Sequence, residues 1–201
     1  MFLSESALLS AIGGYFLGSL PFGLIFGFLF GLGDIRKIGS GNIGTTNMLR
    51  TGNKTATFLT LLFDLSKAAV AALLASLITH NPVYGLIAGT CAVLGHNFPV
   101  WLKFKGGKGV ASTLGMLLAT SFPVGLAACL CWLGVAIISG YSSLSALISL
   151  SVAPLVAFLM GLPKEYTICY AFLALLSIAR HHGNIVRLIQ GKESKIQLRK
   201  K

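Results

Sequence analysis

The sequence predicts an all-α protein that crosses a membrane several times, and three observations support this fold class. Hydrophobic residues make up 55% of the 201 residues and charged residues only 10%. Soluble domains carry roughly 25% charged residues, so the polar surface is too small to cover a water-soluble globule. Apolar runs of the length that a membrane-spanning helix needs recur along the chain. Basic residues outnumber acidic ones by 16 to 5, and most lie between these runs.

The apolar runs predict the transmembrane helices in order. They cover residues 4–30, 56–79, 83–102, 110–138, 142–161 and 165–180. The only early charge is Glu5, unlike the positive start of a secretory signal, so we expect a retained first helix. The fourth run is too long for one crossing and has Pro123 near its middle, which predicts two shorter helices that turn near residues 120–122. Gly14 and Gly18, four residues apart, indicate close helix packing.

The basic residues decide between six and seven crossings. With seven, one side collects 14 of the 16 basic residues: Arg36, Lys37, Arg50, Lys54, Lys103, Lys105, Lys108, Arg180, Arg187, Lys192, Lys195, Arg199, Lys200 and Lys201. Cytosolic loops carry an excess of Lys and Arg. We therefore predict seven transmembrane helices, with the N-terminus outside and the C-terminus cytosolic. We expect one membrane-embedded domain over residues 1–201, ending in a basic tail (192–201) without a catalytic role.

Composition also restricts the possible partners. A basic excess can indicate nucleic acid, but no soluble basic domain exists to carry such a site, so we expect no nucleic-acid partner. The four cysteines lie in apolar runs without metal-ligand spacing, and they are interpreted as small buried residues. The polar segments hold no cluster of acidic residues, so we expect neither a metal nor another cofactor.

The first polar segment, GSGNIGTTNMLR at residues 39–50, combines three glycines with neutral donors and acceptors. Glycine permits close backbone approach, and the planar fork of Arg50 suits phosphate oxygens. An ordinary Gly/Ser/Asn turn before a helix explains the same pattern.

The second polar segment, GHNFPVWLKFKGGKGVAS at residues 95–112, places a glycine-rich turn before a helix. Backbone N–H groups at the start of a helix, together with Lys105 and Lys108, would form an anion site. The spacing does not match a nucleotide-binding P-loop. A positive-inside loop with a tight turn is the alternative, and His96 by itself is typical of a structural histidine near a helix end.

The third polar segment is RHHGNIVR at residues 180–187. A continuing helix would put His181 and Asn184 on one face, where the histidine could act as a base or a hydrogen-bond partner. An interfacial basic helix end is the alternative. Asp64 and Lys67, three residues apart inside the second run, can pair, and ionisable residues within a span are functional candidates. We expect this pair to support the Arg50 loop.

Together these segments resemble the bacterial acyl-phosphate:glycerol-3-phosphate acyltransferase family, PlsY, over essentially the whole chain. The matching residues are 39–50, FDLSKA at 63–68, 95–112 and RHHGNI at 180–185. The resemblance implies a seven-helix inner-membrane enzyme with a cytosolic active site. It would make lysophosphatidic acid from acyl phosphate and sn-glycerol 3-phosphate, coupled to the enzyme that produces acyl phosphate. No Asp stands five positions after any histidine, so the HxxxxD motif of acyl-CoA-type acyltransferases is absent.

The resemblance assigns roles by motif position. Catalytic roles fall on Ser40, Arg50, Lys108, His181 and Asn184. Substrate contacts fall on Gly41, Asn42, Thr46, Asn47, His96, Lys105, Gly106, Gly107, Gly109 and Ser143, with Asp64 and Lys67 in support. Family members can carry a substrate-contacting serine where Ala146 stands here, so Ser143 or Ser145 would have to replace that contact.

The mechanism suggested by these residues is direct attack of the glycerol 1-hydroxyl on the acyl carbonyl. The sequence leaves open whether His181 or the substrate's own phosphate accepts the proton. A small-anion transporter or a membrane scaffold are alternatives from other classes, although polar residues crowd one end rather than lining a path across the membrane. The enzymatic interpretation requires Arg50, Lys108 and Asn184 to meet in one pocket.

Overall fold

The computed structural model describes residues 4–196, and the regular elements in this range are all helices. The α-helices are α1 (Glu5–Gly18), α2 (Phe22–Leu29), α3 (Thr45–Leu49), α4 (Lys54–Thr79), α5 (Pro82–Asn97), α6 (Val110–Thr120), α7 (Phe122–Ser139), α8 (Ser142–Leu159), α9 (Lys164–Arg180) and α10 (His182–Ile189). Two short 3-10 helices, η1 (Ile35–Lys37) and η2 (Val100–Leu102), lie in the connections. The predicted all-α class is confirmed for the described residues.

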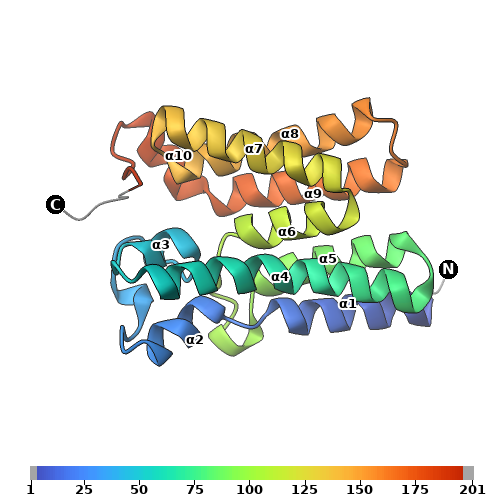
Figure 1. Cartoon of the computed structure of the whole chain (residues 1–201), viewed down its shortest axis with the longest axis horizontal. Coiled ribbons are helices and arrows are strands. Elements are labelled where there is room, and N and C mark those ends of the chain that lie inside the picture. The colour runs from blue at the N-terminus through green and yellow to red at the C-terminus, as the bar shows by residue number, and fades with distance from the viewer. Residues whose placement is uncertain (1–3, 197–201) are drawn as a thin grey trace.

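The long helices run back and forth along one direction (Figure 1). One group packs α1 against α5 and α4 against both α5 and α6, and the other packs α8 between α7 and α9. The short helix α6 also contacts α7, so it joins the two groups. The short helices α3 and α10 lie at the end of the bundle opposite the start of α1 (Figure 1).

The outer surface of the bundle is apolar, as a lipid-facing surface must be. Large side chains in the middle and at the ends of helices are strongly exposed, among them Ile78 (77%), Ile137 (75%) and Ile138 (88%). Within the described residues, five helical segments are long and apolar enough to cross a membrane: Glu5–Leu29, Lys54–Thr79, Pro82–Leu102, Phe122–Ser139 and Ser142–Leu159. The chain is therefore a multi-pass membrane protein.

The predicted division of the long fourth run is confirmed. Helix α6 ends at Thr120 and α7 begins at Phe122. Pro123 lies in the first turn of α7, where its missing N–H has no helical partner to lose. The turn makes α6 only 11 residues long, so it begins well inside the bundle rather than at its end.

The run expected to form the first helix over residues 4–30 is confirmed as a candidate membrane span over Glu5–Leu29, but it consists of two helices rather than one. α1 ends at Gly18 and α2 begins at Phe22, because Pro21 cannot donate to the preceding turn. The break frees the Leu20 carbonyl, which accepts a hydrogen bond from Lys67 Nζ at 3.0 Å. Similarly, the run over 83–102 is not one helix, since α5 ends at Asn97 and the chain continues through Pro99 into η2.

Close packing at the predicted small residues of α1 is confirmed. A Cβ atom added to Gly14 would overlap the backbone of Ala88, and one added to Gly18 would overlap the backbone of Ala92. The two glycines therefore let α1 approach α5 to backbone contact. This contact fixes α5, whose C-terminal end forms part of the wall described next.

Candidate active site

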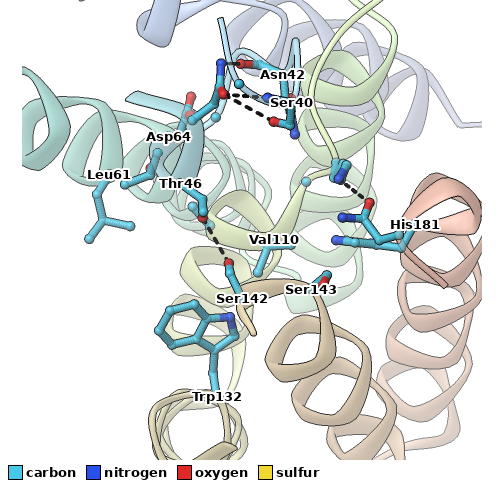
Figure 2. A pocket seen from close by; sticks show the side chains of 18 of the residues that line it. Ser40, Asn42, Thr46, Leu61, Asp64, Val110, Trp132, Ser142, Ser143 and His181 are labelled. Carbon is cyan, nitrogen blue, oxygen red and sulfur yellow. Dashed lines mark hydrogen bonds between the residues drawn. The ribbon is translucent and has the colours of Figure 1, made fainter. Parts of the chain in front are cut away.

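One cavity of about 670 Å³ brings the three polar segments together (Figure 2). All five residues with expected catalytic roles line it: Ser40, Arg50, Lys108, His181 and Asn184. Of the expected substrate contacts, Asn42, Thr46, Asn47, His96, Gly109 and Ser143 also line it, as does Asp64. A second cavity of about 220 Å³ shares Ser40, Asn42 and Lys108 with the first and adds Gly41 and Gly106. Lys105 and Gly107 line neither cavity.

Asn47, in α3, holds the first polar segment in shape. Its Oδ1 accepts hydrogen bonds from the backbone N and the Oγ of Ser40, at 3.0 and 3.3 Å. Its Nδ2 donates to the carbonyls of Ile35 and Asn42, at 2.7 and 2.8 Å. Both amide hydrogens are used, and the residue is only 1% exposed. Asn47 therefore orders the loop that presents Ser40, and it has no free donor for a substrate.

The amides of Gly106 and Gly107 do not contribute to the expected anion site, because both are paired within the protein. Their N–H groups donate to the carbonyls of Asn97 and His96, at 3.2 and 3.0 Å. Their carbonyls accept from the guanidinium of Arg180 at 2.9–3.2 Å. The glycines are instead held between α5 and the end of α9. Sequence reasoning treated Arg180 only as a positive charge.

The start of α6 provides the backbone donors that the glycine loop lacks. Gly109, with a φ of 80°, begins the helix without a side-chain cap. The next two residues, Val110 and Ala111, line the cavity. The first N–H groups of a helix have no intrahelical partner and attract anions. An anion in the cavity would therefore meet the positive end of α6 beside Lys108.

Lys108 lies among other cations in this cavity. Its Nζ donates to Oδ1 of Asn184. Burial lowers the pKa of the Lys108 ammonium to about 8, and the charges of Arg187, Arg180 and Arg50 act in the same direction, whereas Glu193 opposes them. A cation that is buried beside other cations is stabilised when a phosphate binds next to it.

His181 is a neutral imidazole in a defined orientation. Its Nδ1 lies 2.8 Å from the Ser177 carbonyl, which can only accept, so Nδ1 carries the hydrogen. Nε2 then keeps a free lone pair. Burial, together with the nearby charge of Lys108, lowers the His181 pKa to about 4. The ring can accept a hydrogen bond or a proton at Nε2.

The C-terminal segment was expected to be a basic tail without a catalytic role, and the structure places its residues 192–194 in the wall of the cavity. Glu193 Oε1 accepts from Ser143 Oγ at 2.8 Å and from Asn184 Nδ2 at 2.5 Å. Glu193 Oε2 accepts from Arg187 Nε at 2.7 Å. Burial by itself would raise the Glu193 pKa, but these hydrogen bonds hold it below its usual value. The remaining tail, residues 197–201, lies outside the described residues.

Ser194 and Ile196 attach the same segment to two other elements. Ser194 Oγ accepts from the Arg50 guanidinium at 2.5 Å. The Ile196 N–H donates to the Gly140 carbonyl at 2.8 Å, at the turn between α7 and α8. Residues 192–196, here called the C-terminal strap, thus run along the cavity wall and link it to the turn before α8. Its signal in the sequence was a single acidic residue, Glu193, within an otherwise basic tail.

The start of α8 contributes one serine that was predicted and one that was missed. Ser143 lines the cavity, whereas Ser145 does not, and its hydroxyl donates to the Tyr141 carbonyl at 2.8 Å. Ser145 is therefore not a replacement contact. Ser142, which sequence reasoning did not select, lies 2.9 Å from the Thr46 hydroxyl and also lines the cavity (Figure 2).

The predicted pairing of Asp64 with Lys67 is confirmed. Lys67 Nζ lies 3.0 Å from Asp64 Oδ1, with both side chains almost fully buried in α4. The ring of His96 joins them, with Nδ1 2.7 Å from Lys67 Nζ. His96 is thus held as a structural histidine, although one side of it reaches the cavity wall.

The other half of the cavity is apolar. It is lined by Leu61, Leu65, Val110, Leu114, Cys129 and Trp132, from α4, α6 and α7. Figure 2 shows Leu61 and Trp132 on the side away from Ser40 and Asn42. The cavity can therefore hold a molecule with a charged end and a hydrocarbon end.

Comparisons with known proteins agree with this geometry. The family model described as Glycerol-3-phosphate acyltransferase matches residues 8–191. A glycerol-3-phosphate acyltransferase of Rhodospirillum rubrum is 54% identical over 198 residues, covering 95% of this chain and 91% of the relative. One from Paramagnetospirillum magneticum is 53% identical over 192 residues, covering 96% and 94%.

Two solved structures are similar to this chain over almost its whole length. The crystal structure of PlsY, an integral membrane glycerol 3-phosphate acyltransferase in its glycerol 3-phosphate form, matches with a TM-score of 0.90 and 37% identity, covering 96% of each chain. The lysophosphatidic acid form of PlsY matches with a TM-score of 0.88 and 36% identity, covering 95% of each chain. The predicted resemblance is confirmed, and this chain belongs to the glycerol-3-phosphate acyltransferase family of integral membrane proteins.

Proposed function

We propose that this acyltransferase moves an acyl group from acyl phosphate to the 1-hydroxyl of sn-glycerol 3-phosphate, giving lysophosphatidic acid and phosphate. One observation carries the proposal: Arg50, Lys108 and Asn184, from three distant segments, line the same cavity, whose other half is apolar. Both substrates and lysophosphatidic acid carry a phosphate group, the second product is phosphate itself, and the donor and lysophosphatidic acid also carry an acyl chain. A cavity with a cationic half and an apolar half suits all of them.

The cationic half would hold the phosphate groups. Arg50 offers a planar fork of donors, Lys108 a point charge, and the start of α6 unpaired N–H groups. As the acyl–phosphate bond breaks, charge accumulates on the departing phosphate. Fixed positive groups that already face this position lower the barrier, because they need little rearrangement.

Direct transfer accounts for the bonds and the proton. The glycerol O1 forms a bond to the acyl carbon, the bond from that carbon to the phosphate oxygen breaks, and phosphate leaves with the electron pair. The hydroxyl proton passes to His181 Nε2 or to a phosphate oxygen of a substrate. Ser40, Asn42 and Asn184 would orient the substrates by hydrogen bonds. Because acyl phosphate is already activated, positioning supplies much of the rate.

The apolar half of the cavity would hold the first part of the acyl chain. Leu61 and Leu65 belong to α4, whose outer face is apolar, and Leu114 belongs to the more buried helix α6, so the rest of the chain can continue along α4 into lipid. A donor that arrives from the bilayer and an acceptor that arrives from water can then meet at one end of the bundle.

We place the protein in the bacterial inner membrane as one domain over residues 1–201. Seven crossings are proposed, made by α1 with α2, α4, α5, α6, α7, α8 and α9, with the N-terminus outside and the C-terminus cytosolic. In support, the start of α1 and α10 lie at opposite ends of the bundle, and the basic segments 36–54 and 180–195 lie towards the α10 end. The active site would then face the cytosol, where an enzyme that produces acyl phosphate can supply the donor.

The reaction can be tested with the purified protein, acyl phosphate and radiolabelled glycerol 3-phosphate. Lysophosphatidic acid should form with acyl phosphate and not when acyl-CoA replaces it. Mass spectrometry during turnover should find no acylated protein, since the transfer is direct. Product from acyl-CoA alone would overturn the donor assignment, and an acyl group trapped on Ser40 would overturn direct transfer.

A further inference from the structure

His96 lines the cavity, yet its ring is held from behind by a buried ion pair. The side chain is 5% exposed, and Nδ1 lies 2.7 Å from Lys67 Nζ and 3.5 Å from Asp64 Oδ1. Lys67 also contacts Asp64 and the Leu20 carbonyl, so its three hydrogens each have a partner. With Lys67 as the donor, His96 Nδ1 accepts, and Nε2 carries the ring hydrogen.

The opposite edge of the ring lies against Gly107. A Cβ atom added to Gly107 would overlap His96 Nε2, so only glycine fits while the ring is present. The Gly107 N–H also donates to the His96 carbonyl at 3.0 Å. The Arg180 guanidinium holds the Gly107 carbonyl from the other side, at 2.9 Å. The residue that follows this fixed glycine is Lys108.

We propose that His96 is a positioning residue that sets the place of Lys108. Its ring packs between the Asp64–Lys67 pair in α4 and the backbone of Gly107. The ion pair therefore determines where Gly107 lies, and with it the Cα atom of Lys108. For the catalytic rate this inference depends on the proposed function, whereas the packing itself does not. It replaces the expected role of His96 as a substrate contact.

Two physical facts make this arrangement effective. A buried ion pair is difficult to displace, because moving either partner leaves an uncompensated charge, so Asp64 and Lys67 form a rigid support. Catalysis is also sensitive to small displacements: a shift of about 1 Å can reduce a rate about 100-fold. A ring wedged between a rigid pair and a glycine loop prevents such a shift without touching the substrate.

The experiment is a double-mutant cycle of His96→Asn and Gly107→Ala. Asn keeps a polar group near the Nδ1 position that faces Lys67, but it has no atom where Nε2 lies. Gly107→Ala should lower kcat/KM about 100-fold in the native background and less than about fivefold in the His96→Asn background, mainly through kcat. Equal losses in both backgrounds would overturn the inference. If Gly107→Ala alone does not fold, a folded double variant supports it, and an unfolded one contradicts it.

Matched controls distinguish this effect from general disturbance. Gly134→Ala adds the same atom on α7 where nothing lies within 4 Å. His80→Asn changes an exposed histidine at the end of α4 whose φ of 51° asparagine tolerates. Both variants should keep native kcat/KM within about twofold, the range of changes at surface sites without special contacts.

A second measurement does not require activity. Hydrogen–deuterium exchange of the peptide over residues 104–110 should be at least about tenfold faster in His96→Asn than in the native protein, because the Gly107 N–H is less firmly held. Exchange should not change in His80→Asn. Unchanged exchange in His96→Asn contradicts the inference. If the native protein makes no lysophosphatidic acid, the proposed function fails while this measurement still decides the role of His96.

Discussion

Burial leaves Lys108 and His181 in two different protonation states. Both lie in the wall of one cavity, and burial disfavours the charged form of each. Lys108 starts from a high pKa and remains mostly protonated near neutral pH, with a pKa of about 8. His181 starts lower and becomes fully neutral, with a pKa of about 4. The lysine is therefore suited to bind phosphate, and the histidine to accept a hydrogen bond.

The first prediction concerns pH. With Lys108 protonated in the active form, kcat/KM should fall as pH rises through about 8, where this ammonium loses its proton. Lys108→Arg, if it retains activity, should move this decline to higher pH, because a guanidinium stays charged. Initial rates between pH 6 and 9.5 measure both. A decline unchanged in Lys108→Arg would assign it to another group.

The second prediction separates two neighbouring lysines. Lys108→Ala should reduce kcat about 100- to 1,000-fold, as the loss of one preorganised charge stabiliser does. Lys105→Ala should change it by less than about threefold, since this side chain is exposed and lines neither cavity. Fluorescence-detected gel filtration checks that both variants fold. Near-native activity of Lys108→Ala would remove Lys108 from the catalytic residues.

At the scale of elements, the C-terminal strap connects three parts of the site. Glu193 holds Ser143 of α8 together with Asn184 and Arg187 of α10, and Ser194 holds Arg50. The strap therefore fixes α10 against α8 and places one anion among several cations. The strap is held in place by those cations, and their charges stabilise the Glu193 carboxylate in a largely buried position.

The third prediction tests the strap. Glu193→Gln keeps the shape but removes the charge, and the lost charge-assisted hydrogen bonds should destabilise the protein by about 1.5–3 kcal/mol. The melting temperature in detergent should fall, and kcat/KM should fall with it, because an amide has one acceptor oxygen where the carboxylate has two and cannot serve Asn184 and Arg187 together. Glu5→Gln, at the exposed start of α1, is the control and should change neither. Native values for Glu193→Gln would mean that the strap does not order the site.

The fourth prediction tests the contact between α1 and α5. Gly18→Leu would force side-chain atoms into the Ala92 backbone, so we expect loss of the folded protein. Gly13→Leu, on the same helix but with nothing within 4 Å of an added Cβ, should fold normally. Thermal stability in detergent compares them. Equal stability of the two variants would show that α1 does not approach α5 this closely.

At the scale of the whole molecule, the polar residues gather at one end of an apolar bundle. The outer faces of the bundle are rich in exposed Leu, Ile and Phe. Among the described residues, the charged side chains that face a common cavity lie at this end. A bilayer fixes how such a bundle sits, because the apolar surface must stay in lipid. Orientation then determines which compartment reaches the cavity.

The fifth prediction is the orientation itself. Single cysteines are placed at Lys37 and at Lys164 in a variant without the four native cysteines. A membrane-impermeant maleimide should label Lys164→Cys in intact cells with a permeable outer membrane, and Lys37→Cys only after the inner membrane is opened. The reverse pattern would place the cavity on the outer side and contradict the proposed cytosolic orientation.

Much of the fold could be predicted because membrane insertion imposes simple rules on sequence. Runs of apolar residues located the helices, and Pro123 correctly indicated the turn before α7. The break at Pro21 was missed, since composition alone does not reveal that Lys67, far along the chain, binds the freed Leu20 carbonyl. Pro21 is a local signal for the break, whereas the distant side chain that binds the Leu20 carbonyl is set by packing and has no local pattern.

By itself, the sequence determined the membrane class, the division of the long apolar run and the three segments that carry polar chemistry. These features depend on composition and on short-range backbone preferences, which are local properties. Only the tertiary structure decided that the N–H groups of Gly106 and Gly107 donate to carbonyls of α5, that His96 is held by a buried ion pair, and that Glu193 enters the site. Each of these depends on contacts between residues far apart in the chain, so their geometry is set by packing rather than by any local pattern.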